Sequence, residues 1–195
     1  MSKPVLQIIV GSTRPGRVGT AVAEWFQSLA VKHDAFAPLL IELADMGLPL
    51  YDEPKPPRLG KYVHEHTRRW SQTVLAADAF VFVVPEYNHG YNAATKNALD
   101  FLHNEWRGKP VGFVSYGAAA AGARAVQGLL PVVAALGMLS SGRAVTIPQI
   151  ARAVRPGEPY TGNERADEGA ALLLDELSTF TELLAGRKPK STNTE

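Results

Sequence analysis

Apolar positions along this chain fall into short continuous runs, separated by longer stretches in which they recur every three or four residues. Short apolar runs bounded by turn residues are typical of strands that are buried on both faces of a parallel sheet. Such runs predict five strands, at residues 5–10, 36–43, 78–84, 110–115 and 143–147, and Pro85 is expected to end the third.

The stretches between these runs predict helices with one buried face. Their apolar stripes run from Val18 to Leu29, from Val63 to Ala77, over residues 93–102, over residues 121–136 and from Ala170 to Leu184. Asn92 is expected to cap the third helix, and Pro131 to kink or restart the fourth, because proline lacks the N–H that a helix needs. Gly186 favours the end of the last helix. Residues 44–60 contain four prolines and predict a long irregular loop.

Strands that alternate with helices predict an α/β domain with a doubly wound parallel sheet and helices on both faces. We expect this single domain to cover residues 1–186, and the polar residues 187–195 to form a disordered tail. Ligands of such sheets bind beyond the carboxyl ends of the strands, near the point where the strand order reverses. Three loops rich in glycine and polar groups should meet there: residues 11–19, 85–91 and 115–122.

The first of these loops, residues 11–19, has the composition of a phosphate-binding turn. Its glycines let the backbone come close to a ligand, and Ser12 and Thr13 add hydroxyl groups. Arg14 and Arg17 add guanidinium groups that suit phosphate oxygens, and the start of the next helix offers free N–H groups. The alternative is a strand-to-helix turn that needs glycine only for its geometry.

Two common nucleotide loops do not fit this segment. Residues 11–18 have the glycine spacing of a Walker loop, but Arg17 takes the place of its lysine and Val18 that of its magnesium-binding hydroxyl. The dinucleotide pattern G-x-G-x-x-G is also absent. ATP hydrolysis is therefore not expected, and a phosphate monoester on a smaller ligand remains.

The second loop, residues 85–92, offers groups for a flat heterocycle. The ring of Tyr87 can lie against such a ligand, and the amides of Glu86, Tyr87 and Asn88 can hydrogen-bond it without charge. The third loop adds the hydroxyl of Ser115 and further amides beside the same crevice. A tight polar turn with a buried aromatic side chain is the alternative interpretation.

Composition narrows the chemistry and the partners. The chain has 195 residues, a formal net charge of +1 and no cysteine, which excludes disulfides, thiol catalysis and cysteine-held clusters. Redox chemistry would therefore need a bound cofactor. The small net charge gives no broad attraction to nucleic acid or to acidic membranes, so neither is expected as a partner. With no leader or membrane-spanning run recognised, a cytoplasmic protein is the expectation.

Three segments resemble the NADPH-dependent FMN reductases of flavodoxin-like fold, which include quinone, azo-dye and chromate reductases. They are residues 11–14 (Gly-Ser-Thr-Arg), residues 85–88 (Pro-Glu-Tyr-Asn) followed by residues 96–100 (Lys-Asn-Ala-Leu-Asp), and residues 108–117. The resemblance covers the chain from about Val5 to Gly137. It implies a flavodoxin-like sheet with the strand order 2-1-3-4-5.

The resemblance also implies the cofactor and the site. FMN would be bound, NADPH or NADH would donate hydride, and the hydride would pass through FMN to a flavin, quinone or similar small acceptor. FMN itself would carry the chemistry, so no catalytic side chain and no metal is expected. The implied cofactor contacts are Ser12, Arg14, Arg17, Val18 and Gly19 for the phosphate, and Pro85, Glu86, Tyr87 and Asn88 for the ring, with Ser115 and Gly117 nearby.

A homodimer or homotetramer is expected for two reasons. Relatives of this resemblance are dimers or tetramers with the flavin near the interface. In addition, Tyr91, Phe101, Leu102 and Trp106 are more apolar groups than one short helix can bury on its own sheet. They predict an exposed apolar patch that a second copy covers.

The remaining candidates are weaker. His64 and His66 lie two residues apart on a predicted helix and so do not share a face, which favours a solvated surface over a metal site. His89 is a candidate for the crevice wall. Two other functions stay open, an electron-carrier flavodoxin and a flavin-free phosphate-binding regulator of the same fold. Carriers of that kind tend to be acidic, whereas this chain has a net charge of +1.

Overall fold

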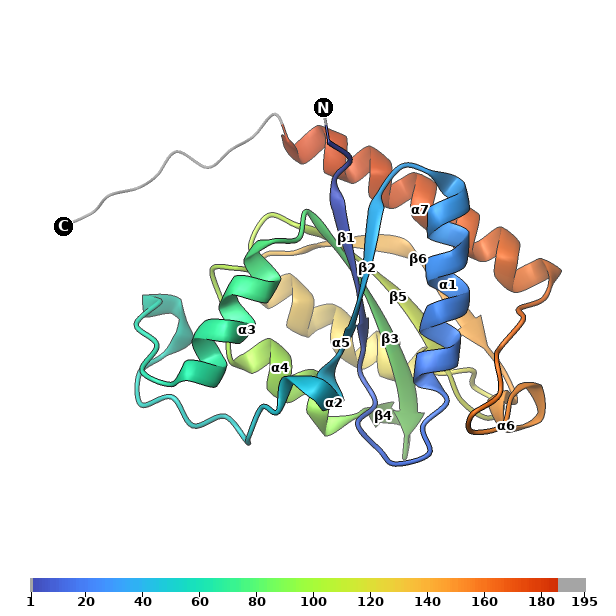
Figure 1. Cartoon of the computed structure of the whole chain (residues 1–195), viewed down its shortest axis with the longest axis horizontal. Helices are drawn as coiled ribbons and strands as arrows, with labels where there is room; N and C mark the ends of the chain where they lie inside the picture. The colour runs from blue at the N-terminus through green and yellow to red at the C-terminus, as the bar shows by residue number, and fades with distance from the viewer. Residues whose placement is uncertain (1, 186–195) are drawn as a thin grey trace.

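The computed structural model describes residues 2–185, in which a parallel sheet lies between two layers of helices (Figure 1). The order across the sheet is β2-β1-β3-β5-β6, and each neighbouring pair is parallel. This is the predicted order of the five long strands, so the predicted fold class is confirmed. The strands are β1 (Val5–Val10), β2 (Ala37–Glu42), β3 (Ala79–Tyr87), β5 (Pro110–Tyr116) and β6 (Leu139–Ile147).

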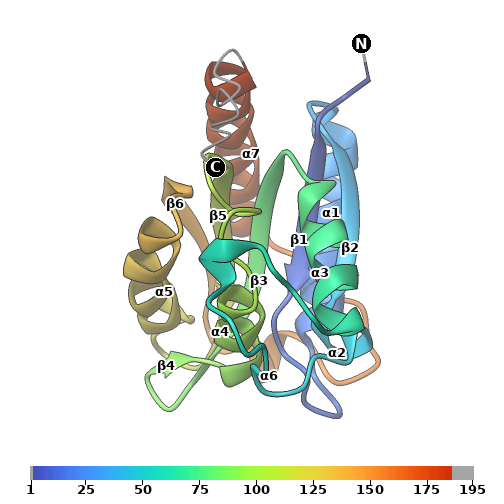
Figure 2. The same ribbon diagram turned by 90° about the vertical axis from the view of Figure 1, so that its left-hand side faces the viewer.

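Helices cover both faces of the sheet, as Figures 1 and 2 show. One face carries α1 (Gly19–His33) and α7 (Glu164–Ala185). The other face carries α3 (Glu65–Leu75), α4 (Ala93–Asp100) and α5 (Ala123–Ala135). Short helical turns lie in the connections: α2 (Leu43–Met46), a 3₁₀ turn at Pro57–Leu59, and α6 (Ile150–Ala153). Within residues 2–185, no helix combines the length and the apolar character needed to cross a membrane.

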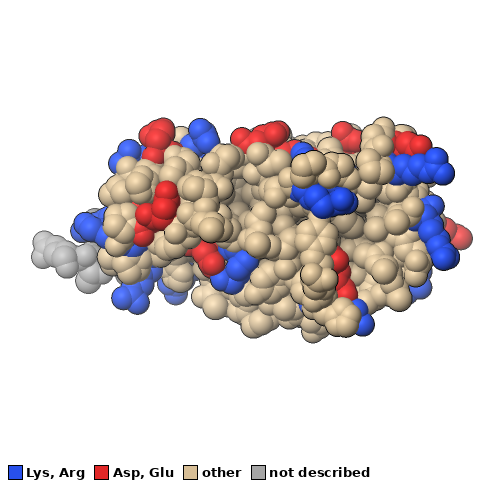
Figure 3. Space-filling view, turned by 90° about the horizontal axis from the view of Figure 1, so that it is seen from below, with Lys and Arg blue, Asp and Glu red and all other residues tan. Residues whose placement is uncertain are grey.

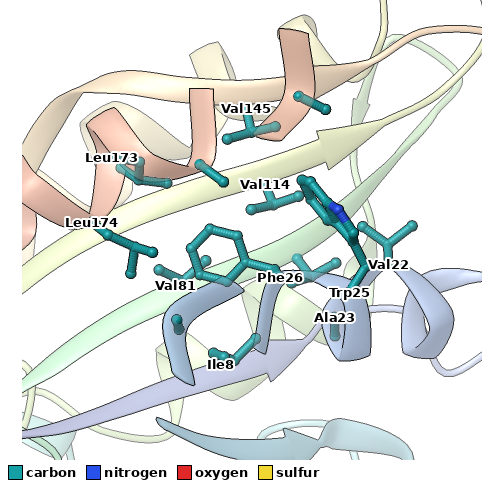
Figure 4. Close-up of a cluster of buried hydrophobic side chains, with 14 of the residues drawn as sticks. Ile8, Val22, Ala23, Trp25, Phe26, Val81, Val114, Val145, Leu173 and Leu174 are labelled. Carbon is teal, nitrogen blue, oxygen red and sulfur yellow. The ribbon is translucent and has the colours of Figure 1, made fainter. Parts of the chain in front are cut away.

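Each face of the sheet has its own apolar core. Successive strand residues point to opposite faces, so Ile8 enters one core and Ile9 the other. In the first core, Phe26 of α1 and Leu173 of α7 pack onto the strands (Figure 4). Fully burying a side chain of this size contributes about 1.5–3 kcal/mol. The two cores hold the strands rigidly and so fix the positions of the loops at their carboxyl ends.

Two prolines behave differently from the prediction. Pro85 does not end β3, because it continues the register with Tyr116 of β5 and because Glu86 pairs with Tyr91 of a short antiparallel strand, β4 (Gly90–Tyr91). Pro131 does not restart α5, which runs through it. Its ring is on the exposed side of the helix, where water can satisfy the carbonyl that loses its N–H partner.

Other boundaries were also predicted imperfectly. Residues 44–60 are not irregular throughout, since they contain most of α2 and the 3₁₀ turn. β6 begins at Leu139, before the predicted start, and a register shift opposite Val111 and Phe113 accommodates the extra residues. The short helix α6 was not predicted. Gly186 and the predicted tail at residues 187–195 lie outside the described residues.

The prediction of an exposed apolar patch after α4 is wrong. Phe101, Leu102 and Trp106 are almost completely buried, at 0%, 1% and 0% exposure. The segment after α4 folds back beneath the sheet, where the Trp106 ring lies 5.9 Å from that of Trp70, and the Trp106 indole N–H donates to the carbonyl of Leu99 at 3.2 Å. These side chains therefore give no support for an oligomer.

Candidate functional site

Four loops meet at the carboxyl edge of the sheet and enclose a cavity of about 420 Å³. They follow β1, β3, β5 and β6, and their lining residues come from residues 12–18, 85–87, 116–118 and 150–156. Figure 3 looks onto this edge, where the middle of the face is hollowed and mostly uncharged and charged side chains lie mainly around it. The volume falls within the roughly 300–1,000 Å³ typical of small-molecule sites.

The loop after β1 presents free hydrogen-bond donors. Gly11 closes the strand by donating its N–H to the carbonyl of Val83 at 2.9 Å. Within the described part of the chain, the N–H groups of residues 12–14 and 18–21 donate to no protein acceptor. Arg14 lines the cavity, is exposed, and forms no ion pair with any of residues 2–185. Unpaired N–H groups at a helix start, beside a free guanidinium group, are suited to a phosphate.

Arg17 differs from Arg14 because its charge is already paired. Its guanidinium group donates to the Glu42 carboxylate from Nε at 3.2 Å and from Nη2 at 3.0 Å. The hydroxyl of Thr20 donates to the other oxygen of the same carboxylate at 2.6 Å. Arg17 lines the cavity, but this network ties the loop to the end of β2 and the first turn of α1.

The loop after β3 is a tight hairpin. Asn88 and His89 have φ values of 49° and 69°, as the two central residues of a type I′ turn require, and the hairpin joins β3 to β4. The hydroxyl of Tyr87 is hydrogen-bonded to that of Ser12 at 2.8 Å, which links this hairpin to the first loop. His89 and Asn88 are exposed at the tip and do not line the cavity.

Glu86 anchors the hairpin to the start of α5. Its carboxylate accepts hydrogen bonds from Nη1 of Arg124 at 2.6 Å and from the backbone N–H of Arg124 at 3.2 Å. Burial alone would raise the pKa of Glu86, but these hydrogen bonds outweigh it and hold the pKa below its usual value. The carboxylate is therefore ionised and already paired, which makes it an anchor rather than a base.

A buried polar link joins the first two loops from behind. The side-chain amide of Asn92 donates to the carbonyl of Gly11 at 2.6 Å, and its oxygen accepts from the hydroxyl of Thr95 at 2.8 Å. Asn92 is the N-cap residue of α4, as predicted, but its side chain makes these two bonds in place of a hydrogen bond to a helix N–H group. A side chain at Gly11 would collide with the Thr95 hydroxyl, so this close approach requires glycine.

The loop after β5 contributes Tyr116 and Gly117 to the cavity. Ser115 is fully buried and donates its hydroxyl to the carbonyl of Ala121 at 3.0 Å, so it shapes the loop rather than facing a ligand. The hydroxyl of Tyr116 is buried and has no hydrogen-bond partner among the described residues. Sequence reasoning missed Tyr116, because its neighbours on both sides were the polar or flexible residues expected of a loop.

The loop after β6 was not predicted as part of the site. Its backbone is fixed to the third loop, because the N–H groups of Gln149 and Ile150 donate to the carbonyls of Ala118 and Gly117, each at 3.0 Å. The signal was available, since β6 also ends at the carboxyl edge, where ligands of parallel sheets bind. The lining residues that this loop adds are Ile150, Ala151, Val154, Arg155 and Pro156.

The predicted cofactor contacts divide into two groups. Most of them line the cavity: Ser12, Arg14, Arg17, Val18, Pro85, Glu86, Tyr87 and Gly117. Three do not line it, namely Gly19, Asn88 and Ser115. Gly19 lies behind the wall, as the first residue of α1, with the Tyr116 hydroxyl against it.

The two histidines near α3 do share a face, although the prediction said that they would not. His64 precedes the helix, so the helical spacing does not apply, and its ring stacks on that of His66 with centroids 5.2 Å apart. His66 is hydrogen-bonded to Asp52 at 2.9 Å. Within the described residues, no group of three or more His, Cys, Asp or Glu side chains is arranged to hold a metal ion.

Comparison with known proteins agrees with this architecture. A relative from Nectria sp, an NAD(P)H-dependent FMN reductase, is 41% identical over 120 residues, which cover 57% of this chain and 59% of that protein. A quinone reductase of Pseudomonas putida is 33% identical over 124 residues, 59% of this chain and 61% of that protein. The matched region thus spans less than two thirds of the length of these relatives.

A solved structure with the same fold is an oxidoreductase from Corynebacterium diphtheriae. Its TM-score is 0.72 at 15% identity, and the superposition covers 94% of this chain and 99% of that one. The family model described as NADPH-dependent FMN reductase matches residues 5–152. This range contains all the residues that line the cavity except Val154, Arg155 and Pro156. The predicted family is confirmed: the chain belongs to the NADPH-dependent FMN reductases.

Proposed function

We propose that this protein is an FMN-dependent NAD(P)H oxidoreductase that passes hydride to a flavin, a quinone or a similar small acceptor. The observation that carries the proposal is the division of one cavity into two chemically different ends. One end has unpaired N–H groups and the free guanidinium group of Arg14, and the other is formed by the rigid, charge-paired hairpin at residues 85–87. FMN has a dianionic phosphate at one end and a flat ring at the other.

The phosphate end fits an anion by its donor set. Ser12 and Arg14 would contact the phosphate together with the N–H groups at the start of α1, whose dipole favours negative charge. Arg155, in the loop after β6, adds a second exposed guanidinium group to the cavity lining. Arg17 would act mainly by holding the loop, because Glu42 neutralises it.

The ring end fits a planar heterocycle by its shape. Pro85 and Glu86 are held in register with β5 and β4, and Gly117 has no side chain to fill the space in front of Glu86. These residues would position the ring and exclude water from one side of it. When bound, FMN supplies the hydride chemistry, which needs no acid or base from the protein. NAD(P)H and the acceptor would use the same open side in turn.

The test is spectroscopic and kinetic. Purified protein should bind FMN at one site per chain, released by heat and identified by chromatography, and should consume NADPH steadily when a benzoquinone is added. FAD in place of FMN, or no flavin after reconstitution, would contradict the proposal. Bound FMN with negligible NAD(P)H turnover would favour an electron carrier, and absence of flavin with retained phosphate binding would favour a regulator.

The cytoplasmic location and the homodimer or homotetramer remain part of this proposal. The patch that was expected to support association is buried, so the oligomer now has support only from the resemblance to the family. Light scattering of the purified protein tests it. A mass of 21.0 kDa, that of one chain, at micromolar concentration would refute association.

A further inference from the structure

Two guanidinium groups that line the cavity, those of Arg14 and Arg155, form no ion pair within residues 2–185. The remaining charged side chains of the lining, Arg17 and Glu86, are each paired with an oppositely charged side chain of the protein. The proposed function assigns Arg14 to the phosphate of FMN. Arg155 is therefore a second free positive charge at the cavity, and the proposed function gives it no ligand of its own.

The backbone that carries Arg155 is fixed, although the side chain is exposed. The N–H of Ile150 donates to the carbonyl of Gly117 at 3.0 Å, which ties this loop to the loop after β5. Val154, directly before Arg155, is 4% exposed and belongs to the core beneath α1 and α7. Directly after it, the N–H of Glu158 donates to the carbonyl of Arg155 at 3.0 Å. A buried residue on one side and a turn on the other thus fix where the arginine side chain leaves the backbone.

Arg155 lies near the tip of the loop after β1. The ring of its neighbour Pro156 would be 4.0 Å from a methyl group built on Gly16, which lies at that tip. The unpaired N–H groups of the loop belong to residues 12–14 and 18–21, on either side of the tip. Figure 1 shows α6 and the loop after β1 at the same end of the sheet. Because Arg155 both lines the cavity and is exposed, its place is the rim.

The phosphate of FMN has enough donors without Arg155. A phosphate monoester offers three terminal oxygens as acceptors. The unpaired N–H groups on both sides of Gly16, together with Arg14, can satisfy them, and the dipole of α1 favours the same charge. The second ligand of the proposed reaction is also phosphorylated. NADPH differs from NADH only in a phosphate on the 2′-oxygen of its adenosine ribose, a group that an arginine commonly accommodates.

We propose that Arg155 binds the adenosine 2′-phosphate of NADPH and so makes the protein prefer NADPH to NADH. This inference rests on the proposed function and extends it, because it names the residue that selects the hydride donor. The planar guanidinium group can give a phosphate two parallel hydrogen bonds. The adenosine half of the donor would stay at the rim while its nicotinamide lies against the ring of FMN. The family model matches only as far as residue 152, so this determinant belongs to the chain's own loop.

Arg152 provides a matched control. It lies in α6, three residues before Arg155, is exposed, forms no ion pair within the described chain, and does not line the cavity. Arg152→Ala and Arg155→Ala each remove one positive charge from the same segment, so the general attraction of anions changes to a similar degree. Arg155→Lys keeps the charge and removes the planar fork.

The first experiment measures binding without turnover, by calorimetric titration of the FMN-loaded protein with NADP⁺ and with NAD⁺. Wild type should bind NADP⁺ more tightly. Arg155→Ala should weaken NADP⁺ binding about fivefold to tenfold, the lower end for hydrogen bonds between charged groups because the side chain is exposed, and leave NAD⁺ binding within about twofold. Arg152→Ala should change neither, and Arg155→Lys should lose less than Arg155→Ala. Equal losses for both dinucleotides, or no loss for NADP⁺, would overturn the inference.

Two further measurements separate the donor site from the FMN site. With a benzoquinone as acceptor, the ratio of kcat/KM for NADPH to that for NADH should fall in Arg155→Ala by the same factor as the binding. Titration of the cofactor-free variant with FMN should give an affinity within about twofold of wild type. A tenfold loss of FMN affinity with an unchanged dinucleotide preference would place Arg155 on the FMN phosphate and overturn the inference. Wild type that uses NADH as well as NADPH would also overturn it, whereas wild type that uses neither would refute the proposed function itself.

Discussion

The two ends of the cavity differ in whether their polar groups are paired within the protein. At the end formed by the loop after β1, the N–H groups of residues 12–14 and the Arg14 guanidinium group have no protein partners among residues 2–185. At the hairpin end, Glu86 is paired with Arg124, and the backbone is paired within the β3–β4 ladder. The first end leaves its donors free for a ligand, and the second end uses its polar groups to hold its own shape. A charged group is thus expected to bind at the first end and a neutral ring at the second.

The largest effect is expected where the two ends are joined. Asn92→Ala leaves the Gly11 carbonyl and the Thr95 hydroxyl without their buried partner, which should lower the free energy of unfolding by about 2–4 kcal/mol. Affinity for FMN and for riboflavin should fall together, because both loops lose their relative position. Chemical denaturation and flavin titration measure the two effects.

Asn97→Ala is the control for this variant. Asn97 lies on the same helix and binds the 49–51 segment, through the Pro49 carbonyl at 2.7 Å and the Tyr51 N–H at 2.9 Å, without touching the first loop. It should leave flavin affinity unchanged. If Asn97→Ala weakened flavin binding as much as Asn92→Ala, the hydrogen bonds of Asn92 would have no special role in positioning the two loops.

The next effect concerns the free end alone. Arg14→Ala should weaken FMN binding about tenfold to a hundredfold, since a charge-assisted hydrogen bond contributes roughly 1.5–3 kcal/mol. Riboflavin binding and the stability of the cofactor-free protein should be unchanged, because the Arg14 side chain has no partner in the part of the chain that the structure describes. Arg152→Ala removes an exposed charge that does not line the cavity and should leave both flavins unaffected. Equal effects of the two variants would mean that Arg14 is an ordinary solvated surface residue and does not bind the phosphate.

The same contrast explains which site residues could be predicted from the sequence and which could not. Arg14 and Tyr87 line the cavity where their loops were expected to meet, because a local motif, a glycine-rich turn or a strand end, fixes their position. Arg17 was predicted as a phosphate contact, but its partner Glu42 lies on another strand, and only the parallel register of β1 and β2 brings them together. Tyr116 was missed for a related reason, since its side chain reaches Gly19, which lies far from it in the sequence.

Errors in the fold have the same origin. From its neighbours in the sequence, Pro85 is predicted to end a strand. Only the pairing of Glu86 with Tyr91 shows that β3 continues. Trp106 looks exposed beside one short helix, but its ring packs against those of Trp70 and Phe80 from distant segments. Periodicity and turn residues therefore predicted the elements and their order, whereas side-chain partners that are remote in sequence could not be predicted.

A smaller effect on stability and flavin affinity is expected at the hairpin end, where Glu86 is paired with Arg124. Glu86→Gln weakens the anchor to Arg124 and should lower stability by about 1 kcal/mol at neutral pH, the usual net contribution of such a bond at a half-exposed partner. Both flavins should bind about twofold to fivefold more weakly, because the ordered hairpin is less populated. Glu176→Gln, which removes an anchor of similar kind on Ser141, should lower stability without changing flavin affinity.

The pH dependence of that anchor has a definite sign. The pKa of Glu86 is lowered in the folded protein, so its contribution is present above its ordinary pKa of 4.5 and is lost as the pH falls through the lower folded value. Wild type should therefore lose more stability on acidification below about pH 4.5 than Glu86→Gln does. Parallel denaturation curves for the two proteins across this range would contradict the assignment of Glu86 as an ionised anchor.

The smallest effect is predicted for Arg17, and it separates a charge that binds ligand from a charge that holds a loop. Because Glu42 accepts two hydrogen bonds from its guanidinium group, Arg17→Ala should reduce FMN affinity by no more than about twofold, well below the loss at Arg14. Riboflavin affinity should fall by the same factor, since the loop and not the phosphate is affected. Glu42→Gln should then act in the opposite direction on FMN alone, because it frees the Arg17 charge for the phosphate end while Thr20 can still donate to the amide oxygen. A selective loss of FMN affinity in Arg17→Ala as large as that in Arg14→Ala would mean that both arginines bind the phosphate directly, and that the Glu42 pair opens when the ligand arrives.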